Sequence, residues 1–475
     1  MSVSMTEADG ATRERRSDEG TEADRVAGIM DPRLPQLKTG LDLEEMRALF
    51  ENRVLHDSES VRVERCDLLQ ARYKPGMSCL FSYSLRLRDR RTGAAAQRVF
   101  YVRTYENNGS RSRYLKALSQ PLVTVAGAAA ITHLPEREMV VWAFPNDRKL
   151  HGLPALAAPG PLIDAAAKAA WGPGWRIDEA EHDLVHYVAE HTCTLRVRVR
   201  VEEVGTGERR SATLYGKTYY NDEGAEAFEN MGWLWNSDAR RRGRLRVAQP
   251  ICYQPEARVL WQMGIEGTPL IEHESDHAAF PPLLEKAAGA IAELHQTDLP
   301  LVRSRSLADR LESLRESQHR ISIAAPALAG SVGRIVGRLV DQAPRETNRP
   351  IVPLHGDLHL KNFFVTGSDV ALIDLDNLHH GDPLAEIGSF LAGLYYRNLI
   401  TEHPLAEAQQ STSRFIEAYR RRVEWAVPPR DLAWEIATAL ILERASRCIT
   451  RMKPGGFAIL PSLIEAAGQF CQNSR

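Results

Sequence analysis

Hydrophobic and polar residues alternate along much of the first half of the chain, whereas hydrophobic residues recur every three or four positions in the second half. Alternation is typical of half-buried β-strands, and the wider spacing is typical of amphipathic helices. Strand-like runs lie within residues 79–105 and 193–219, and helical spacing dominates residues 282–295, 306–343 and much of 384–470. The pattern predicts an α+β fold, with two β-rich modules followed by a mostly helical one.

The two β-rich modules resemble each other in sequence. Residues 79–105 align without gaps on residues 193–219, and seven of the 27 aligned positions are identical, including a Thr-Gly turn and a closing Thr-Tyr pair. Each copy reads as a β-hairpin, because two alternating runs flank the polar turn. A similar strand follows in each copy, at residues 135–142 and 255–261. These matches favour a divergent internal duplication.

Composition sets the expected domain boundaries. Residues 1–36 are poor in apolar residues and rich in charged and small polar ones, so we predict that they are disordered. An N-terminal module is expected over residues 37–150, the second module over 158–262 and the helical module over 263–475. The short segment between the first two modules is rich in Pro, Gly and Ala, as linkers are.

Charge and cysteine content exclude several classes of function. Lys and Arg number 60 against 62 Asp and Glu, for a net charge of −2, whereas nucleic-acid-binding domains carry a basic excess. No apolar run is long enough to span a membrane, and no secretory signal is visible. The six cysteines form no Cys-x-x-Cys pair, which favours the reducing cytoplasm. We expect a cytoplasmic protein with neither a nucleic-acid nor a membrane partner, and the sequence indicates no protein partner.

The chemistry is concentrated in residues 352–386, which read VPLHGDLHLKNFFVTGSDVALIDLDNLHHGDPLAE. Asn362 follows Asp357 by five positions, and two short apolar strands joined by a turn lead to Asp374 and Asp376, which alternation puts on one side of the chain. Phosphoryl transfer needs a carboxylate that orients a hydroxyl and accepts its proton, and hard oxygen ligands for Mg²⁺. Asp357 fits the first role, and Asn362 and Asp374 fit the second.

This segment resembles the catalytic core of the aminoglycoside phosphotransferase and choline-kinase-like family, which has the protein-kinase-like fold. The family pattern His-Gly-Asp-x-x-x-x-Asn, then an apolar strand and Asp-x-Asp, stands here as HGDLHLKN and LIDLD, and GDPLAE follows. The resemblance implies a bilobal kinase unit over residues 158–475, preceded by an N-lobe-like cap. It also implies that Asp357 is catalytic, that Asn362, Asp374 and Asp376 bind Mg²⁺, and that ATP is the phosphoryl donor.

The same resemblance implies a nucleotide site in the second module. The strand LYGKTY carries a lysine at the position of the family's phosphate-binding lysine, and the helix after it carries the acidic partner. The implied nucleotide-binding residues are Thr192 and Lys217 at the phosphates, with Glu226, slightly favoured, or Glu229 positioning Lys217. The backbone of Gln262, Met263 and Gly264 is expected at the adenine. The expected phosphate-binding turn, residues 187–192, contains no glycine.

The expected function is ATP- and Mg²⁺-dependent phosphorylation of a small-molecule hydroxyl, with the resemblance implying a sugar, amino sugar, aminocyclitol or amino alcohol as acceptor. Two alternatives stay open. The glycine-free turn suits a nucleotide-binding regulatory pseudokinase, and a protein kinase acting on a partner is disfavoured by the lack of an Ala-Pro-Glu segment. The N-terminal module carries Arg103 where the second has Lys217, so we interpret it as a cap that covers the cleft or helps to select the substrate.

Overall fold

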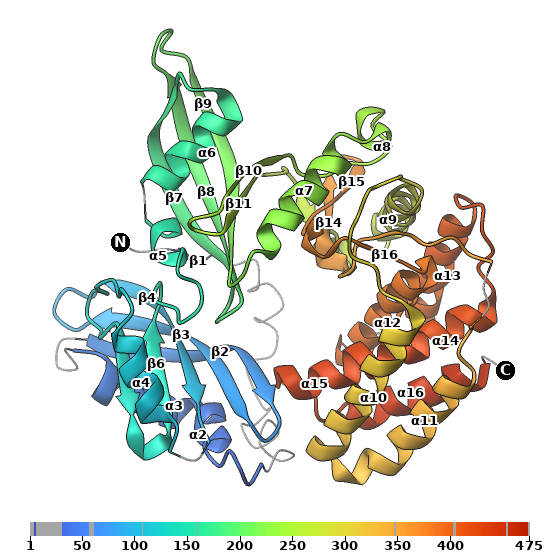
Figure 1. Ribbon diagram of the computed structural model, residues 1–475, viewed down its shortest axis with the longest axis horizontal. Coiled ribbons are helices and arrows are strands. Elements are labelled where there is room, and N and C mark those ends of the chain that lie inside the picture. The colour runs from blue at the N-terminus through green and yellow to red at the C-terminus, as the bar shows by residue number, and fades with distance from the viewer. Residues whose placement is uncertain are drawn as a thin grey trace. The chain divides into compact units, whose positions relative to one another are not determined.

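The computed structural model describes residues 4–5, 31–56, 61–106, 108–158, 160–345, 348–401, 405–452 and 455–473 (Figure 1). The chain divides into two compact units. The first takes residues 1–224, 251–261 and 449–457, and the second takes residues 225–250, 262–448 and 458–475. The N-terminal module and most of the second module fall within the first unit, whereas residues 225–250 of the second module belong to the second unit. The finer boundaries expected from the sequence stay a prediction. The predicted fold class is confirmed, because antiparallel sheets dominate the N-terminal region and helices the C-terminal region.

The N-terminal module is a five-stranded antiparallel sheet with the strand order β2-β3-β4-β6-β5. Its strands are β2 (Val61–Lys74), β3 (Ser78–Asp89), β4 (Ala95–Thr104), β5 (Ile131–Leu134) and β6 (Met139–Ala143), and its helices are α2 (Leu37–Leu41), α3 (Leu43–Leu49) and α4 (Ser110–Leu118). A π-helical turn, Phe50–Val54, continues α3. The sheet therefore carries its helices before the first strand and after the third.

The second sheet repeats this plan. Its order is β7-β8-β9-β11-β10, with β1 (Ser4–Met5) beside β7. Its strands are β7 (Trp175–Val188), β8 (Thr192–Glu203), β9 (Arg209–Tyr219), β10 (Pro250–Gln254) and β11 (Val259–Met263). The helices in this stretch of the chain are α5 (Leu153–Leu156), α6 (Pro161–Trp171), α7 (Glu223–Trp235) and α8 (Asp238–Arg241), and the last two belong mainly to the second unit. Tyr73 pairs with Cys79 in the first sheet as Tyr187 pairs with Cys193 in the second. The shared order and register support the duplication inferred from sequence.

Two segments differ from their predictions. Residues 31–36, the end of the segment predicted to be disordered, form turns in which Leu34 is fully buried and Gln36 donates a hydrogen bond to the Tyr105 carbonyl. The burial of Leu34 and the hydrogen bond of Gln36 hold residues 31–36 in place. Most of the residues before them lie outside the described part of the chain. The predicted linker contains α5, whose Leu153 and Leu156 are fully buried. Local composition misses both because the burial depends on partners distant in sequence.

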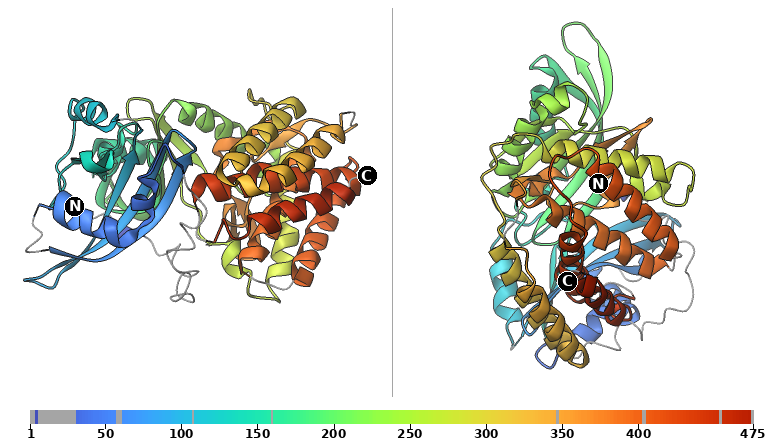
Figure 2. Two further views of the ribbon diagram at one scale, coloured as in Figure 1. Left: turned by 90° about the horizontal axis from the view of Figure 1, so that it is seen from below. Right: turned by 90° about the vertical axis from the view of Figure 1, so that its right-hand side faces the viewer.

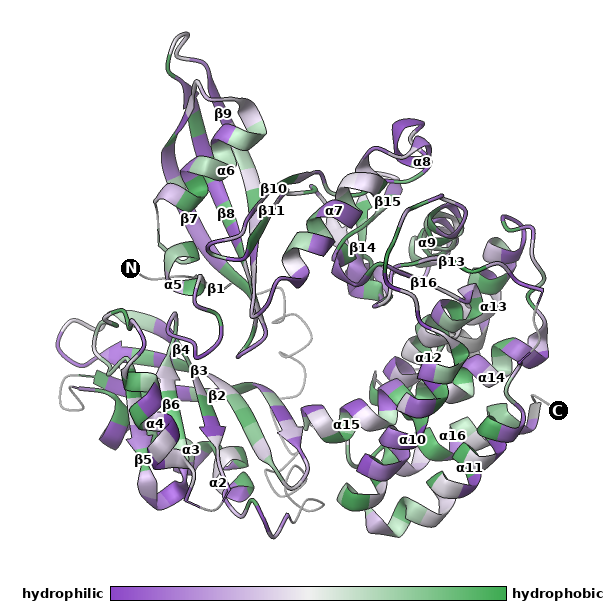
Figure 3. Cartoon of the chain, viewed as in Figure 1, coloured by the Kyte–Doolittle hydropathy of each residue, from purple (hydrophilic) through white to green (hydrophobic). Residues whose placement is uncertain are grey.

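The alternation of apolar and polar residues along the strands explains why each sheet buries one face. Inward side chains of β8, such as Cys193, Leu195, Val197, Val199 and Val201, are buried, while the residues between them are half-buried or exposed. Figure 3 shows this as alternating green and purple along the ribbon. Because successive side chains of a strand point to opposite faces, one face enters the core and the other meets solvent.

The C-terminal region is mostly helical, as predicted (Figure 2). Its helices are α9 (Phe280–His295), α10 (Leu307–Ala324), α11 (Ala329–Asp341), α12 (Pro383–Thr401), α13 (Leu405–Arg420), α14 (Pro429–Ala439), α15 (Ser446–Arg451) and α16 (Leu460–Asn473). Helix α12 packs on α14, and α9 packs on α13. A π-helical turn, Leu440–Ala445, lies between α14 and α15 in the region predicted to be helical. Among the described residues, no helix combines the length and the apolar character that crossing a bilayer requires.

Short strands hold the segment that carries the predicted catalytic and metal-binding residues. Strand β13 (Val352–Leu354) pairs with β16 (His379–Gly381), and β14 (Phe363–Thr366) pairs with β15 (Asp369–Leu372) in the hairpin predicted from sequence. Strand β12 (Thr268–Pro269) adds to β14. These pairings bring the loop that follows β13 close to the end of β15.

Candidate active site

Glu386 fixes the backbone of the loop after β13. Its carboxylate accepts hydrogen bonds from the N–H groups of His355, at 3.0 Å, and Gly356, at 2.7 Å, and it lies 3.0 Å from Nε2 of His295. Burial raises the pKa of Glu386, but His295 and the Gly356 N–H outweigh it and hold the pKa below the usual range. An ionised carboxylate therefore sits under the loop.

Gly356 is required by the geometry of this loop. Its φ is +84°, a left-handed conformation that glycine adopts without strain. A Cβ atom here would lie 2.3 Å from the carbonyl oxygen of Asn377. The turn therefore packs the backbone before Asp357 directly against the segment that follows β15. His355 is fully buried, and its Nε2 lies 2.9 Å from the carbonyl oxygen of Ile373, which agrees with a bracing role for this side chain.

Asn362 joins the Asp357 loop to the end of β15. Its side-chain Nδ2 donates a hydrogen bond to the backbone carbonyl of Asp357, at 2.9 Å. Its own backbone carbonyl accepts from the N–H of Ile373, at 3.0 Å, which sets Asn362 beside the residue that precedes Asp374. These two bonds tie the Asp357 loop, predicted to be catalytic, to the segment that carries the second predicted metal ligand.

The side chains of Asn362 and Asp374 offer oxygen donors at this junction. Since Nδ2 of Asn362 is engaged, the amide presents Oδ1 as its other end. Asp374 has a left-handed backbone, with φ +59°. An amide oxygen and a carboxylate on adjoining segments are hard donors of the kind that Mg²⁺ prefers, so this part of the predicted metal set fits the ion.

Asp376 contributes to the site through its backbone as well. Its carbonyl accepts a hydrogen bond from Arg303 Nη2, at 2.9 Å.

Within the described ranges, no group of three or more His, Cys, Asp and Glu side chains could hold a metal ion. The predicted Mg²⁺ set of Asn362, Asp374 and Asp376, which includes an amide, stays a prediction.

The side chain of Asp357 is about one-third exposed and faces positive charge. Arg447 Nη2 lies 3.6 Å from its Oδ1, and His359 Nε2 lies 3.9 Å from its Oδ2. Burial lowers the pKa of His359 to about 4, although Asp357 acts in the opposite direction. His359 is therefore neutral near pH 7, and Arg447 supplies the positive charge beside Asp357.

Glu226 contacts an arginine of the same unit. Arg303 Nε donates to its Oε1 at 2.6 Å, so Arg303 bridges Glu226 on α7 and the Asp376 carbonyl. Glu229, the other candidate partner for Lys217, is exposed on α7. Which glutamate pairs with Lys217 stays a prediction.

Thr192 and Lys217 lie in the first unit, on adjacent strands of the second sheet. Thr192 begins β8, opposite Val188 of β7, and Lys217 lies on β9, opposite Thr194. Lys217 Nζ also lies 5.8 Å from the ring centroid of Tyr219. Lys217 therefore lies on a strand, and its position and role as the phosphate-binding lysine stay a prediction.

The turn between β7 and β8 is held by a buried carboxylate. Glu190 has φ +59° and is 5% exposed. Arg103 Nη1 lies 2.6 Å from its Oε2, and Arg148 Nε donates to its Oε1 at 2.7 Å. Asp147 Oδ2 accepts from the Glu190 N–H, at 2.9 Å. The N-terminal module thus fixes the turn that the resemblance assigns to phosphate binding.

The predicted adenine-binding residues lie at the end of β11 and just beyond it. Met263 donates its N–H to the carbonyl of Gln249, at 2.9 Å. That donor is therefore engaged within the protein. Gln262 and Gly264 flank it, and their contact with adenine stays a prediction.

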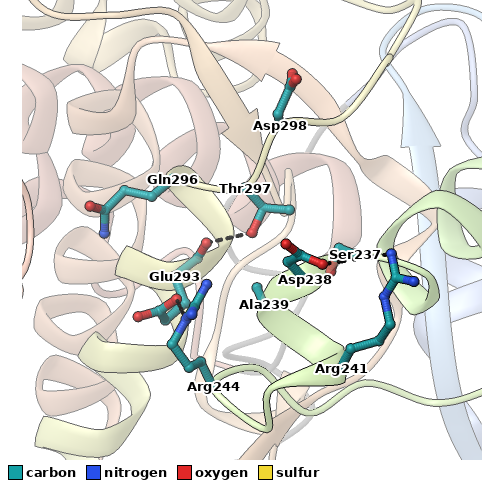
Figure 4. A pocket seen from close by; sticks show the side chains of 9 residues that line it. All are labelled: Ser237, Asp238, Ala239, Arg241, Arg244, Glu293, Gln296, Thr297 and Asp298. Carbon is teal, nitrogen blue, oxygen red and sulfur yellow. Dashed lines mark hydrogen bonds and ion pairs between the residues drawn. The ribbon is translucent and has the colours of Figure 1, made fainter.

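A polar hollow of about 620 Å³ lies elsewhere in the second unit, between α8 and the end of α9 (Figure 4). Arg244 Nε donates to Glu293 at its wall, and Thr297 donates to the Glu293 carbonyl. Its lining residues are Ser237, Asp238, Ala239, Arg241, Arg244, Glu293, Gln296, Thr297 and Asp298. None of them belongs to the predicted catalytic segment, so this hollow is separate from the candidate active site.

Sequence reasoning missed several residues that shape the site. Glu386 had a local signal, since it closes the GDPLAE segment. Arg303, Arg447 and Glu190 had none, because their partners are distant in sequence. The local sequence motif therefore predicts the Asp357 loop, but it does not predict the charged residues around that loop.

Comparison with known proteins relates this chain to phosphotransferases. No curated protein matches the chain. Among solved structures, a thermostable mutant of aminoglycoside phosphotransferase APH(4)-Ia is 15% identical, with a TM-score of 0.45, and the match covers 65% of this chain and 98% of that one. A choline/ethanolamine kinase family protein from Mesorhizobium loti is 14% identical, with a TM-score of 0.42, covering 65% and 94%. Residues 195–425 match the model of the phosphotransferase enzyme family, which confirms the predicted resemblance over that range.

Proposed function

We propose that the chain is a cytoplasmic kinase that uses ATP and Mg²⁺ to phosphorylate a hydroxyl group of a small molecule. The family match supports a phosphotransferase. The observation that carries the proposal is the structure of the Asp357 loop. Glu386 accepts hydrogen bonds from two backbone N–H groups of this loop, and Asn362 ties the loop to the end of β15. The acceptor classes implied by the resemblance are sugars, amino sugars, aminocyclitols and amino alcohols.

In this proposal Asp357 orients the acceptor hydroxyl and takes its proton as the oxygen attacks the γ-phosphorus of ATP. The bond from that phosphorus to the bridging oxygen breaks, and ADP leaves. Asn362 and Asp374, with Asp376, would hold Mg²⁺, which when bound neutralises phosphate charge. Lys217 binds phosphate. Catalysis then comes mainly from positioning and electrostatic stabilisation.

Replacement of Asp357 tests the proposal. Asp357→Ala removes the proton acceptor, so turnover should fall by roughly a hundredfold to ten thousandfold while nucleotide binding survives. Asp374→Ala should instead weaken binding of Mg²⁺-ATP. Thermal melting with Mg²⁺-ATP and with EDTA reports binding, because a ligand of the folded state raises the midpoint. Asp369→Asn, at the start of β15, is the matched control and should behave as wild type. Unchanged turnover in Asp357→Ala would exclude the assignment.

A nucleotide-binding regulatory pseudokinase is the second candidate. The observation in its favour is the β7–β8 turn, which contains no glycine and holds Glu190, an acidic residue, where phosphate is expected. This candidate predicts a Mg²⁺-dependent rise in melting temperature with ATP and no phosphorylated product with any hydroxyl compound. Product formation that requires Asp357 would exclude it.

A further inference from the structure

One arginine of the C-terminal helices lies beside Asp357, the catalytic carboxylate of the proposed function. Arg447 lies 3.6 Å from Asp357 and is 42% exposed, so a ligand can reach it from solvent. Arg444 lies three residues earlier in the chain, and its Nη2 is 3.5 Å from Oε2 of Glu443. An acceptor hydroxyl bound at Asp357 would therefore lie close to Arg447.

Arg444 and Arg447 both lie at a π-helical turn in the C-terminal helices. Helices α14 and α15 form a continuous run through the π-helical turn Leu440–Ala445, which contains Arg444 and ends two residues before Arg447. A π turn bonds each residue to the fifth along, so the side chains after it are rotated from the face that an unbroken α-helix would present. Such turns occur frequently at functional sites.

Arg444 has an unused donor. Its side chain is about 10% exposed, and Nη2 donates to the carbonyl of Ser389 at 2.8 Å. Its Nε is buried and has no hydrogen-bond partner. This buried atom is not open to a ligand, and Arg444 mainly holds the π turn to α12 through the Ser389 carbonyl.

The carboxylates on the neighbouring helices all have partners inside the protein. On α12, α14 and the π turn these are Glu386 with His295, Asp431 with Arg349, Glu435 with Arg310, and Glu443 with Ser389. Helix α15 contains no acidic residue. The described parts of these helices thus offer no unengaged carboxylate to a cationic acceptor.

We infer that the acceptor carries an anionic group, a carboxylate or a phosphate, near the hydroxyl that is phosphorylated, and that Arg447 binds this group. The planar guanidinium matches both anions. The inference rests on the proposed function and narrows its acceptor class to compounds such as a sugar acid or a sugar phosphate.

Steady-state kinetics on the full chain with Mg²⁺-ATP test it. The acceptors are glucuronate, glucose 6-phosphate, glucose and glucosamine, and the products are identified by mass. An anionic sugar should exceed the neutral and cationic ones in kcat/KM by roughly tenfold or more. The two anionic compounds distinguish a carboxylate from a phosphate. Highest kcat/KM with glucose or glucosamine would overturn the inference and leave the kinase assignment intact.

A variant separates binding from chemistry. Arg447→Gln should raise KM for the anionic acceptor more than it lowers kcat, and Arg447→Lys should restore part of the loss. Arg338→Gln, an exposed arginine of α11, is the control. An Arg447→Gln variant with unchanged KM for the anionic acceptor would overturn the inference.

If none of the four sugars is phosphorylated, sulfate serves as the probe. With saturating Mg²⁺ and AMP-PNP, sulfate should raise the melting temperature of the wild type more than that of Arg447→Gln, at ionic strength matched with chloride. Equal shifts would overturn the inference. Absence of any shift with AMP-PNP itself would instead count against the proposed function.

Discussion

Glu386 is a positioning residue whose effect on the catalytic loop can be measured. Glu386→Gln keeps the shape of the side chain but replaces one acceptor oxygen by an NH₂ group, which would face a backbone N–H or His295. Loss of a charged hydrogen bond and a buried unpaired donor should lower the free energy of unfolding by about 2–3 kcal/mol. Denaturant unfolding measures this, and kcat should fall with it because Asp357 follows directly on the two bound N–H groups.

The control for this prediction is Glu424→Gln, since Glu424 is exposed. Wild-type stability together with wild-type kcat in Glu386→Gln would contradict the assigned role. At the residue scale, the sequence predicted Asp357, Asn362 and Asp374 because a short spacing brings them together. It did not predict Arg447, which lies 90 positions after Asp357, since no local pattern marks a long-range ion pair.

At the scale of elements, the β7–β8 turn depends on the ion cluster around Glu190. Removing one partner of a buried ion pair costs about 3–5 kcal/mol, because the other charge stays buried. Glu190→Gln should therefore loosen the turn, and amide hydrogen exchange over residues 187–193 should accelerate. Glu208→Gln, in the exposed turn at the other end of β8, is the control. Unchanged exchange in Glu190→Gln would show that the turn is held without its carboxylate.

Strands and long helices were predictable because their periodicity reflects one buried face. The π turn Leu440–Ala445 was not, since the apolar spacing of residues 430–452 is equally compatible with an unbroken helix. The turn at Glu190 was identified as lacking glycine, but a buried glutamate there runs against the usual exposure of acidic side chains. Only its arginine partners, 87 and 42 positions away, explain it.

At the scale of the whole molecule, the internal repeat and the compact units describe different divisions of the chain. The duplication was visible because the hairpins of the two copies align without gaps. Their association in one unit was not, because it depends on contacts such as that of Arg148 with Glu190. The segments 225–250 and 262–448 instead share a unit that holds the predicted catalytic and metal-binding residues.

The pH dependence of stability follows from a charge buried in that second unit. Glu435 on α14 is 2% exposed, and burial raises its pKa to about 7, although Arg310 lies 2.5 Å away and acts in the opposite direction. Between an unfolded pKa near 4.5 and this folded value, the folded protein binds the extra proton. Its contribution to stability is therefore complete below about pH 4.5 and is lost as the pH rises through 7.

Glu435→Gln removes this titration. Relative to the variant, the wild type should lose roughly 3 kcal/mol of unfolding free energy between about pH 4.5 and 7.5. Denaturant unfolding at several pH values measures the difference, with Glu424→Gln as the exposed control. Parallel curves for wild type and Glu435→Gln would mean that Arg310 keeps Glu435 ionised throughout this range, and the loss of stability with rising pH would then have to arise from another group.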